Sequence, residues 1–242
     1  MKKIYPAFFL LLASLANYGQ NEKNIVVDGN AEVRQVGSFS GIEVSGAIDL
    51  YLSQGSEEAV AISASSDEIK QRIRTEVRNG NLLIYFDGKG LNWKIWGNHK
   101  MKAYITFKTL KRLEASGACN VRATGSIRQD ELKMELSGAS DFSGEVNVKQ
   151  LRIDASGASN ARIAGAAEET NIIASGACTI KAYDLRTSKC KTDANGASHI
   201  RITVEKELDA QASGGSSIYF KGNGLIRNIS SSGGASVKRA DN

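Results

Sequence analysis

The chain has 242 residues and a formal net charge of +5, which is long enough for one domain with its own core. A small positive excess gives no reason to expect nucleic acid as a partner. After the first 19 residues, no segment approaches the roughly eighteen consecutive apolar residues of a membrane-spanning helix, so no transmembrane segment is expected once a leader is removed. The 24 glycines and single proline, Pro6, favour strands joined by tight turns, because proline cannot donate to a strand ladder.

Residues 1–19 have the pattern of a secretory signal peptide. Lys2 and Lys3 form a basic start, residues 7–16 are apolar, and Gly19-Gln20 is a candidate cleavage site. The apolar run is too short to span a bilayer. We therefore expect an exported protein, periplasmic or extracellular. No cysteine lies near the cleavage site, so we do not expect a lipoprotein.

Residues 25–110 contain strand-like runs without a regular period. These runs cover residues 41–52, 59–63, 82–86 and 102–107. A capping box formed by Ser65 and Glu68 predicts one short helix, and Asn79-Gly80 predicts a hairpin turn. We interpret this part as wider, irregular coils that are continuous with the repeat described next. They would cover its N-terminal end, where an open strand edge would invite aggregation.

From residue 111 to residue 242, a short Ser-Gly-Ala motif returns about every nineteen residues. Its glycines are 18 to 21 residues apart, and an eighth copy stands alone at Gly46. A period of this length is the coil length of a β-solenoid. The glycines of the repeat are Gly117, Gly138, Gly157, Gly176, Gly196, Gly214 and Gly233.

Alignment on the glycine reveals apolar columns with a period of two, which is the strand signature. One column, four residues before the glycine, contains Leu113, Met134, Ile153 and Ile172. The fold class that we predict is all-β, a right-handed parallel β-helix of about seven regular coils of 18–21 residues. The serines that precede the glycines are expected to form a hydrogen-bonded ladder. A helical solenoid has no room in this period, and an antiparallel meander would need more hairpin turns.

Three cysteines are an odd number for an exported protein. Cys119 and Cys178 occupy the same repeat position three coils apart, roughly 14 Å, which is too far for a disulfide. Cys178 and Cys190 lie in neighbouring coils at different positions, so a bridge between them is the alternative. We favour three small buried thiols.

Several segments resemble a known family. The segments FSGIEVSGAIDLYL, TEVRNGNLLIYF and KAYITFKTLKRLEASGA occur in this order, and SGAS-type repeats follow. Over roughly residues 33–223 they resemble the bacterial head GIN domain family, which is labelled "putative auto-transporter adhesin" and was formerly a domain of unknown function. The resemblance implies a right-handed parallel β-helix in an exported protein. It implies no catalytic residues.

Two charged columns point outward on the same strands. One contains Arg112, Lys133, Arg152 and Lys191, and the other contains Glu114, Glu135, Asp154 and Asp193. Because neighbouring columns of opposite charge relieve the repulsion within each, we expect a surface ladder of salt bridges. The alternative is a polysaccharide lyase or hydrolase site, since glycosidases use two carboxylates about 5–10 Å apart.

A third outward column is basic and has no acidic partner column. It contains Arg122, Arg162, Lys181, Arg201 and Lys238, with Ser143 and Tyr219 between them. The first four cations are a candidate site for an anionic glycan or another surface polymer. Trp93 and Trp96 lie in a loop that could stack on a sugar ring or fold over an open end of the core. The alternative for the basic column is an ordinary solvated face.

The function that these patterns favour is a non-enzymatic, exported β-helix with an adhesin-like binding surface. No catalytic, metal-binding or cofactor-binding pattern is present in the sequence, so we expect no cofactor. The alternatives are a carbohydrate-active enzyme on the same scaffold and a structural cell-envelope protein, because β-helices host many functions. The sequence makes no prediction of the oligomeric state.

Overall fold

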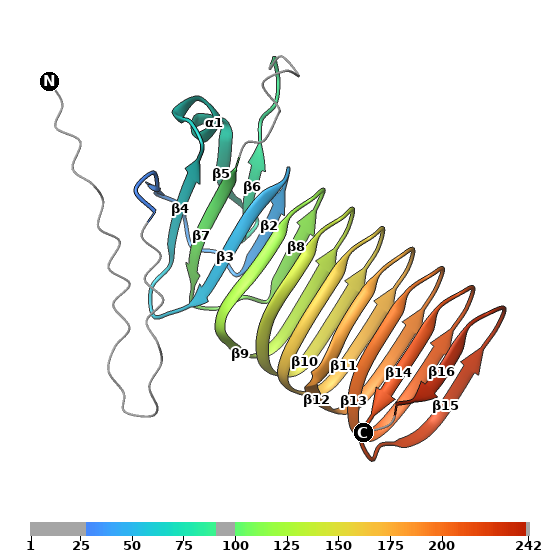
Figure 1. Ribbon diagram of the computed structural model, residues 1–242. Coiled ribbons are helices and arrows are strands. Elements are labelled where there is room, and N and C mark those ends of the chain that lie inside the picture. The colour runs from blue at the N-terminus through green and yellow to red at the C-terminus, as the bar shows by residue number, and fades with distance from the viewer. Residues whose placement is uncertain (1–27, 91–99, 241–242) are drawn as a thin grey trace, which may run out of the picture.

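The chain is wound into a solenoid of stacked strands (Figure 1). This is a computed structural model that describes residues 28–90 and 100–240. Parallel coils account for most of the molecule and make about seven turns, which confirms the predicted parallel β-helix. The predicted signal peptide, residues 1–19, lies outside the described residues.

Each regular coil is a strand that bends back on itself, and a Ser-Gly-Ala corner joins it to the next coil (Figure 1). Neighbouring coils pair in parallel along almost their whole length. The strands of this part are β8 (Arg112–Ser116), β9 (Asn120–Leu136), β10 (Asp141–Ala155), β11 (Asn160–Ala174), β12 (Thr179–Ala194), β13 (His199–Ala212), β14 (Ser217–Lys221), β15 (Leu225–Ser231) and β16 (Ser236–Arg239).

The corners need glycine for two reasons. Gly157 has a φ of +73°, which side chains other than hydrogen rarely allow. A Cβ atom on Gly157 would also lie 2.5 Å from the carbonyl oxygen of Gly138 in the preceding coil. The corners approach so closely because the Ala158 N–H donates to that same carbonyl at 2.7 Å. The motif glycine is therefore set by the stacking of one corner on the next.

The core consists of apolar columns that continue from coil to coil. Leu113, Met134, Ile153 and Ile172 pair in register across β8 to β11, and all four are completely buried. This confirms the predicted column. Burial of each such side chain contributes about 1.5–3 kcal/mol. Because every coil repeats the same columns, stacking alone builds one continuous core.

The expected ladder of serines before the glycines is wrong. Among these serines, the described structure contains one side-chain bond between neighbouring coils, from Ser213 to Asn195. The buried hydroxyls instead lie two residues after the glycine, where the Oγ of Ser159 donates to the Ser156 carbonyl at 2.9 Å. The strand alternation turns the serine before the glycine toward solvent, and the chain points inward again only beyond the corner.

The three cysteines are buried and free, as predicted. Cys119 and Cys178 replace the inner serine, and the Sγ of each lies 3.2 Å from a backbone carbonyl three residues earlier. Burial raises the pKa of the Cys190 thiol to about 12. These thiols therefore serve as small core groups, and no disulfide links Cys178 to Cys190.

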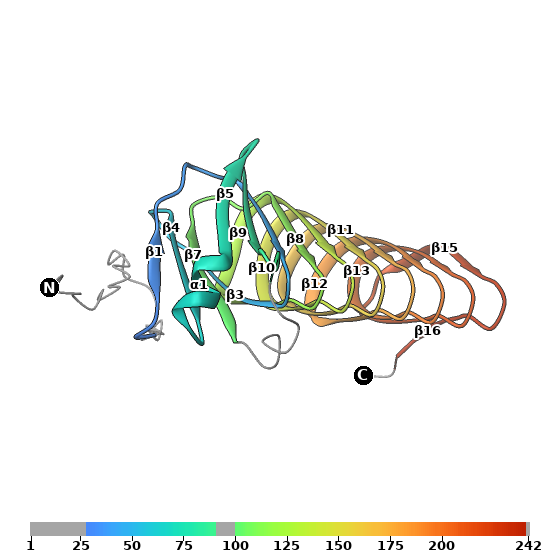
Figure 2. The same ribbon diagram turned by 90° about the horizontal axis from the view of Figure 1, so that it is seen from above.

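The N-terminal part is wider and mixes parallel with antiparallel pairing (Figure 2). β2 and β3 pair in parallel with β8 and β9, so they extend the coils by one layer. β4 and β1 then add in antiparallel fashion beyond β7. The elements of this part are β1 (Glu32–Arg34), β2 (Gly41–Ser45), β3 (Ile48–Gln54), β4 (Ala59–Ala64), α1 (Asp67–Arg72), β5 (Ile73–Arg78), β6 (Asn81–Phe86) and β7 (Met101–Phe107).

The predicted helix exists, but its capping residue was assigned one position too early. Ser66, not Ser65, is the N-cap, and its Oγ accepts the Ile69 N–H at 3.3 Å. The one buried side chain of this helix is Ile69. The predicted hairpin turn is confirmed, since Asn79 and Gly80 have φ angles of +50° and +77° between the antiparallel strands β5 and β6.

Candidate functional site

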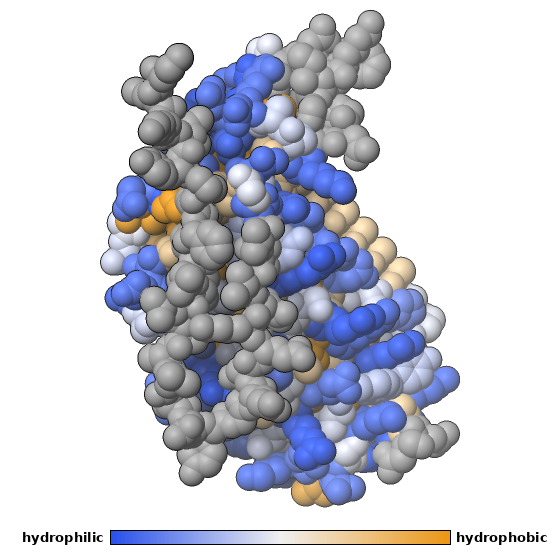
Figure 3. Space-filling model, turned by 60° about the vertical axis from the view of Figure 1, so that its left-hand side comes forward, coloured by the Kyte–Doolittle hydropathy of each residue, from blue (hydrophilic) through white to orange (hydrophobic). Residues whose placement is uncertain are grey.

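Each coil has two arms that face opposite sides of the solenoid. We call the residues that follow a corner glycine the first arm and those that precede the next glycine the second arm. The inward side chains of both arms are buried in the shared core, as Val121 and Met134 show in β9. Their outward side chains must then project on opposite faces. These faces have different charge patterns, and Figure 3 shows parallel rows of hydrophilic side chains on the surface.

The first-arm face carries the predicted basic column, which we call the cationic stripe and define as Arg122, Arg162, Lys181 and Arg201. The pairing register runs from Arg122 through Ser143 to Arg162, and from there to Lys181 and Arg201. Members on neighbouring coils are therefore about 4.8 Å apart along the solenoid, and Arg122 and Arg162, which are two coils apart, are separated by about twice that distance. All four are exposed. In the part of the chain that the structure describes, none of them forms a salt bridge.

Tyrosines extend the column at both ends of the stripe. The Arg122 guanidinium lies 5.9 Å from the centre of the Tyr51 ring, and Tyr51 stacks on Tyr104 at 5.1 Å. At the other end, Tyr219 pairs in register with Arg201. The Tyr104 hydroxyl donates to Asp28 at 2.8 Å. Burial and this hydrogen bond raise the pKa of Tyr104, which keeps the phenol neutral.

The sequence placed Tyr219 in the basic column, but Tyr51 and Tyr104 were not predicted to belong to it. A signal was present, because the isolated motif copy at Gly46 places Tyr51 five residues after its glycine, the position of Arg122 in the regular repeat. Tyr104 has no such motif beside it. It joins the column only because β7 pairs with β3 in the fold.

The second-arm face carries the predicted salt-bridge ladder, and three of its four coils form it. Hydrogen bonding to Lys133, supported by the nearby Arg112, lowers the pKa of Glu135. The ladder therefore holds the Glu135 carboxylate in its charged form. Five contacts of 2.6 to 3.8 Å make it: Arg112–Glu114, Arg112–Glu135, Lys133–Glu135, Lys133–Asp154 and Arg152–Asp154.

The fourth rung was predicted incorrectly. Asp193 accepts a hydrogen bond from the Asn195 side chain at 2.9 Å and forms no salt bridge with Lys191 within the described residues. The coil before it has Asn171 and Ile173 at the ladder positions. Lys191 and Asp193 therefore have no charged neighbour on that side.

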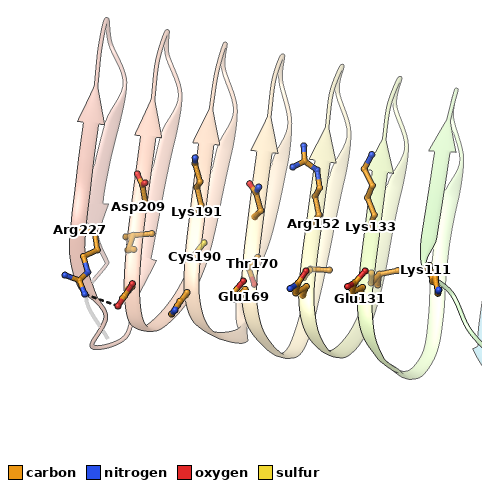
Figure 4. A pocket seen from close by; sticks show the side chains of 17 residues that line it. Lys111, Glu131, Lys133, Arg152, Glu169, Thr170, Cys190, Lys191, Asp209 and Arg227 are labelled. Carbon is orange, nitrogen blue, oxygen red and sulfur yellow. Dashed lines mark hydrogen bonds and ion pairs between the residues drawn. The ribbon is translucent and has the colours of Figure 1, made fainter.

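A shallow groove, which sequence reasoning missed, runs beside the ladder on the second arm (Figure 4). Its volume is about 710 Å³. One of its rims is the register column Glu131, Gln150, Glu169, Lys189 and Glu207. Three members of this column are acidic, Lys189 is basic and Gln150 is neutral, and Glu207 is paired with Arg227 at 3.0 Å. The mixture of charges left no pattern in the sequence.

The remaining predicted site residues, Trp93 and Trp96, lie outside the described residues. Among residues 28–90 and 100–240, no cluster of three or more histidine, cysteine or acidic side chains is placed to bind a metal. The same residues contain no helix that is long and apolar enough to cross a membrane. The stripe and the groove are two surfaces on which the described structure could bind a ligand.

Residues 38–224 match a family model described as "Putative auto-transporter adhesin, head GIN domain". The match covers the stripe, most of the N-terminal part and the regular coils up to β14. None of the curated proteins matches the chain.

Solved structures of bacterial proteins share the fold at low sequence identity. A "putative adhesin" from Bacteroides fragilis NCTC 9343 is 23% identical with a TM-score of 0.78, over 87% of this chain and 96% of that chain. A "putative adhesin" from Parabacteroides merdae ATCC 43184 is 20% identical with a TM-score of 0.67, over 87% and 95%. A "Putative lipid binding protein" from Parabacteroides distasonis ATCC 8503 is 19% identical with a TM-score of 0.66, over 88% and 98%. At such identities the likeness establishes the fold alone.

Proposed function

The chain belongs to the head GIN domain family, and from this premise we propose that it is an exported, non-enzymatic surface protein that binds an anionic glycan along the cationic stripe. The family description names an adhesin. The signal-peptide pattern of residues 1–19 supports export.

The observation that carries the proposal is the contrast between the two faces. On the second arm, cations and carboxylates alternate and neutralise one another. On the first arm, four exposed cations share one column without a salt bridge in the described residues. Stacked like charges repel, and a fold can relieve that repulsion with a neighbouring acidic column. A column whose charge repulsion is not relieved by neighbouring acids favours a polyanionic partner.

The geometry suits a linear polymer with repeated charges. The cations follow one line, so one chain laid across the coils would contact several of them at once. Weak single contacts then add through a high effective concentration. Beside the stripe runs a polar column in which Asn160 donates to Asp141 at 2.8 Å and which continues to Thr179. Amide and hydroxyl groups of this kind can bond to sugar hydroxyls.

The non-enzymatic part of the proposal rests on the carboxylates of the second-arm ladder. Glycoside hydrolysis uses two carboxyl groups, one of which must change its protonation state. Glu114, Glu135 and Asp154 are instead engaged by neighbouring cations. The lowered pKa of Glu135 is opposite to what a general acid requires.

The test is retention of the mature chain on an anionic polysaccharide resin as the salt concentration rises. The test variant changes Arg122, Arg162, Lys181 and Arg201 to serine. The matched control removes the same charge elsewhere, at the exposed residues Lys100, Lys108, Arg128 and Lys206. We expect the parent and the control to be retained and then released by salt, because exposed charges are screened. The stripe variant should pass through.

Two further measurements test which anion is bound and whether it is cleaved. Vesicles of anionic phospholipid ask whether a lipid headgroup is bound in place of a glycan. Incubation of the parent with the same polysaccharide, followed by measurement of chain length, asks whether it is cleaved. Equal retention of parent and stripe variant, preference for vesicles over glycan, or cleavage of the polymer would each contradict the proposal.

A further inference from the structure

The last coil of the solenoid has an open strand edge. β15 lies at the end of the stack (Figure 2) and pairs with β13 on one side, and all of its residues are exposed. Four large hydrophobic side chains are exposed in the residues that the structure describes, and three of them lie on β15: Leu225 at 67%, Ile226 at 49% and Ile229 at 39%. An unpaired edge of this kind is a template for another strand.

Two of these side chains, Ile226 and Ile229, belong to core columns rather than to an outward face, whereas Leu225 pairs with the outward residue Glu207. Ile226 continues the column of Leu208, and Ile229 continues that of Ala210. Leu208 and Ala210 are completely buried because the next coil covers them. At β15 no further coil follows in the described structure, so the same columns end in solvent. Another coil edge complements such an end, just as the edge of the next coil does at every internal junction.

The other end of the solenoid is closed to such pairing. On the first-arm side, β1 pairs with β4 and β4 with β7, all in antiparallel fashion. On the second-arm side, to which β15 belongs, the outermost strand is β5, which pairs antiparallel with β6. Both outer strands are charged, since Glu32 and Arg34 of β1 form an ion pair at 3.3 Å and Glu76 and Arg78 of β5 form one at 2.8 Å. Charged edge strands resist the addition of further strands, which disfavours head-to-tail growth and favours the same end of a second copy as the matching edge.

The charges of β15 allow two copies to meet. Its one charged residue, Arg227, is neutralised by Glu207 at 3.0 Å. On the neighbouring arm, the Arg239 guanidinium lies 4.8 Å from the centre of the Phe220 ring and donates to backbone carbonyls, so it caps that part of the core. Like charges therefore do not face each other along β15.

We propose that two copies of this chain join tail to tail by antiparallel pairing of β15 with β15 across a twofold axis. A symmetric contact of this type closes on itself and forms a dimer rather than a fibre. Ile226 and Ile229 of both copies then lie within one continuous core. Because each arm continues into the same arm of the second copy, both first-arm faces point to the same side. The dimer does not depend on the proposed glycan binding.

The first test is the molar mass in solution, by light scattering and sedimentation velocity over a range of concentrations. Ile226→Lys places a charge in the contact, and Val33→Lys is the matched control. Val33 is also an exposed hydrophobic residue, 41% accessible, but it lies on β1 at the closed end. We expect the parent and Val33→Lys to dimerise and Ile226→Lys to be monomeric or to dissociate at least tenfold more readily. Both positions are exposed, and thermal unfolding checks that each variant is folded.

The second test is cross-linking through an introduced thiol. Asn228 is the central residue of β15 and lies nearest the proposed axis. The native cysteines are buried, so they should not react. Under mild oxidation, Asn228→Cys should give a disulfide-linked dimer, and Val33→Cys should not. Four outcomes would overturn the proposal: a parent that is monomeric at every concentration, a dimer that survives Ile226→Lys, equal cross-linking of both introduced thiols, or polymers that grow with concentration. The glycan-stripe variant should remain dimeric, which separates this test from the first proposal.

Discussion

At the scale of single residues, the corner glycine decides how closely two coils approach. Substitution of Gly157 by valine adds a Cβ within 2.5 Å of the Gly138 carbonyl oxygen and strains a φ of +73°. We expect a loss of unfolding free energy of about 1–3 kcal/mol, the usual cost of such strain. Urea denaturation measures it.

The matched control for this prediction is Gly29→Val. Nothing lies within 4 Å of a Cβ built at Gly29, and its backbone is not in the left-handed region. Its effect should stay within about 0.5 kcal/mol, as for other exposed positions. Equal stabilities of the two variants would show that the corners are not tightly stacked.

The buried thiols lead to a second prediction at this scale. Cys119, Cys178 and Cys190 are buried and unpaired, and burial raises the pKa of each. Because the thiolate is the reactive form, we expect almost no reaction with a thiol reagent at neutral pH in the folded protein. After denaturation without reductant, three thiols per chain should react. A titre of one thiol would indicate a disulfide instead.

At the scale of the element, the second-arm ladder links β8, β9 and β10 through their outward side chains. The carboxylate of Glu135 contacts Arg112 and Lys133 at 2.6 and 2.7 Å. Its pKa lies below the ordinary value of 4.5. Its stabilising effect is therefore fully present above that value and is lost as the pH falls through the lower, folded pKa.

Glu135→Gln tests this effect. The variant should be less stable than the parent at neutral pH, and the difference should shrink in acid, where the parent carboxylate becomes protonated. Glu131→Gln is the control, because Glu131 is exposed and forms no salt bridge among the described residues. Urea denaturation at several pH values makes the comparison. A difference in stability that does not vary with pH would show that the charged ladder does not stabilise the fold.

At the scale of the whole molecule, the solenoid has a stable middle and a weak C-terminal end. β10, β11 and β12 are each covered by a coil on both sides, whereas β15 is exposed along its whole length. In a stack of coils, stability depends on contacts with nearest neighbours. We expect the slowest hydrogen exchange in β10 to β12 and fast exchange in β15 of the monomeric Ile226→Lys variant.

The same measurement on the parent connects this expectation to the tail-to-tail dimer. Pairing of β15 with a second copy should slow exchange in that strand, because its amides would gain partners. Uniform exchange from end to end would contradict the nearest-neighbour view of this solenoid. Fast exchange in β15 of both proteins would count against the dimer.

Strand pairing and core columns could be predicted from the repeat alone. Seven glycines at spacings of 18 to 21 residues align Leu113 with Met134 and its successors, and the structure keeps that register. Strict repetition allows this prediction because each coil packs on a near copy of itself, so the local residue pattern also gives the contacts between coils. The cationic stripe was visible in advance for the same reason.

Only the tertiary structure decided what lies outside the repeat. The pairing of β7 with β3 brings Tyr104 beside Tyr51, although 52 residues separate them and no motif marks Tyr104. The missing rung at Asp193 and the groove along Glu131 and Glu169 depend on which neighbour each side chain meets across the coils. The coil, its columns and its corners follow from the repeat period and from steric fit, so they could be predicted from the residues alone. Contacts between non-repeating residues, and the exposed edge of β15, depend on where the winding begins and ends, and only the folded chain decides that.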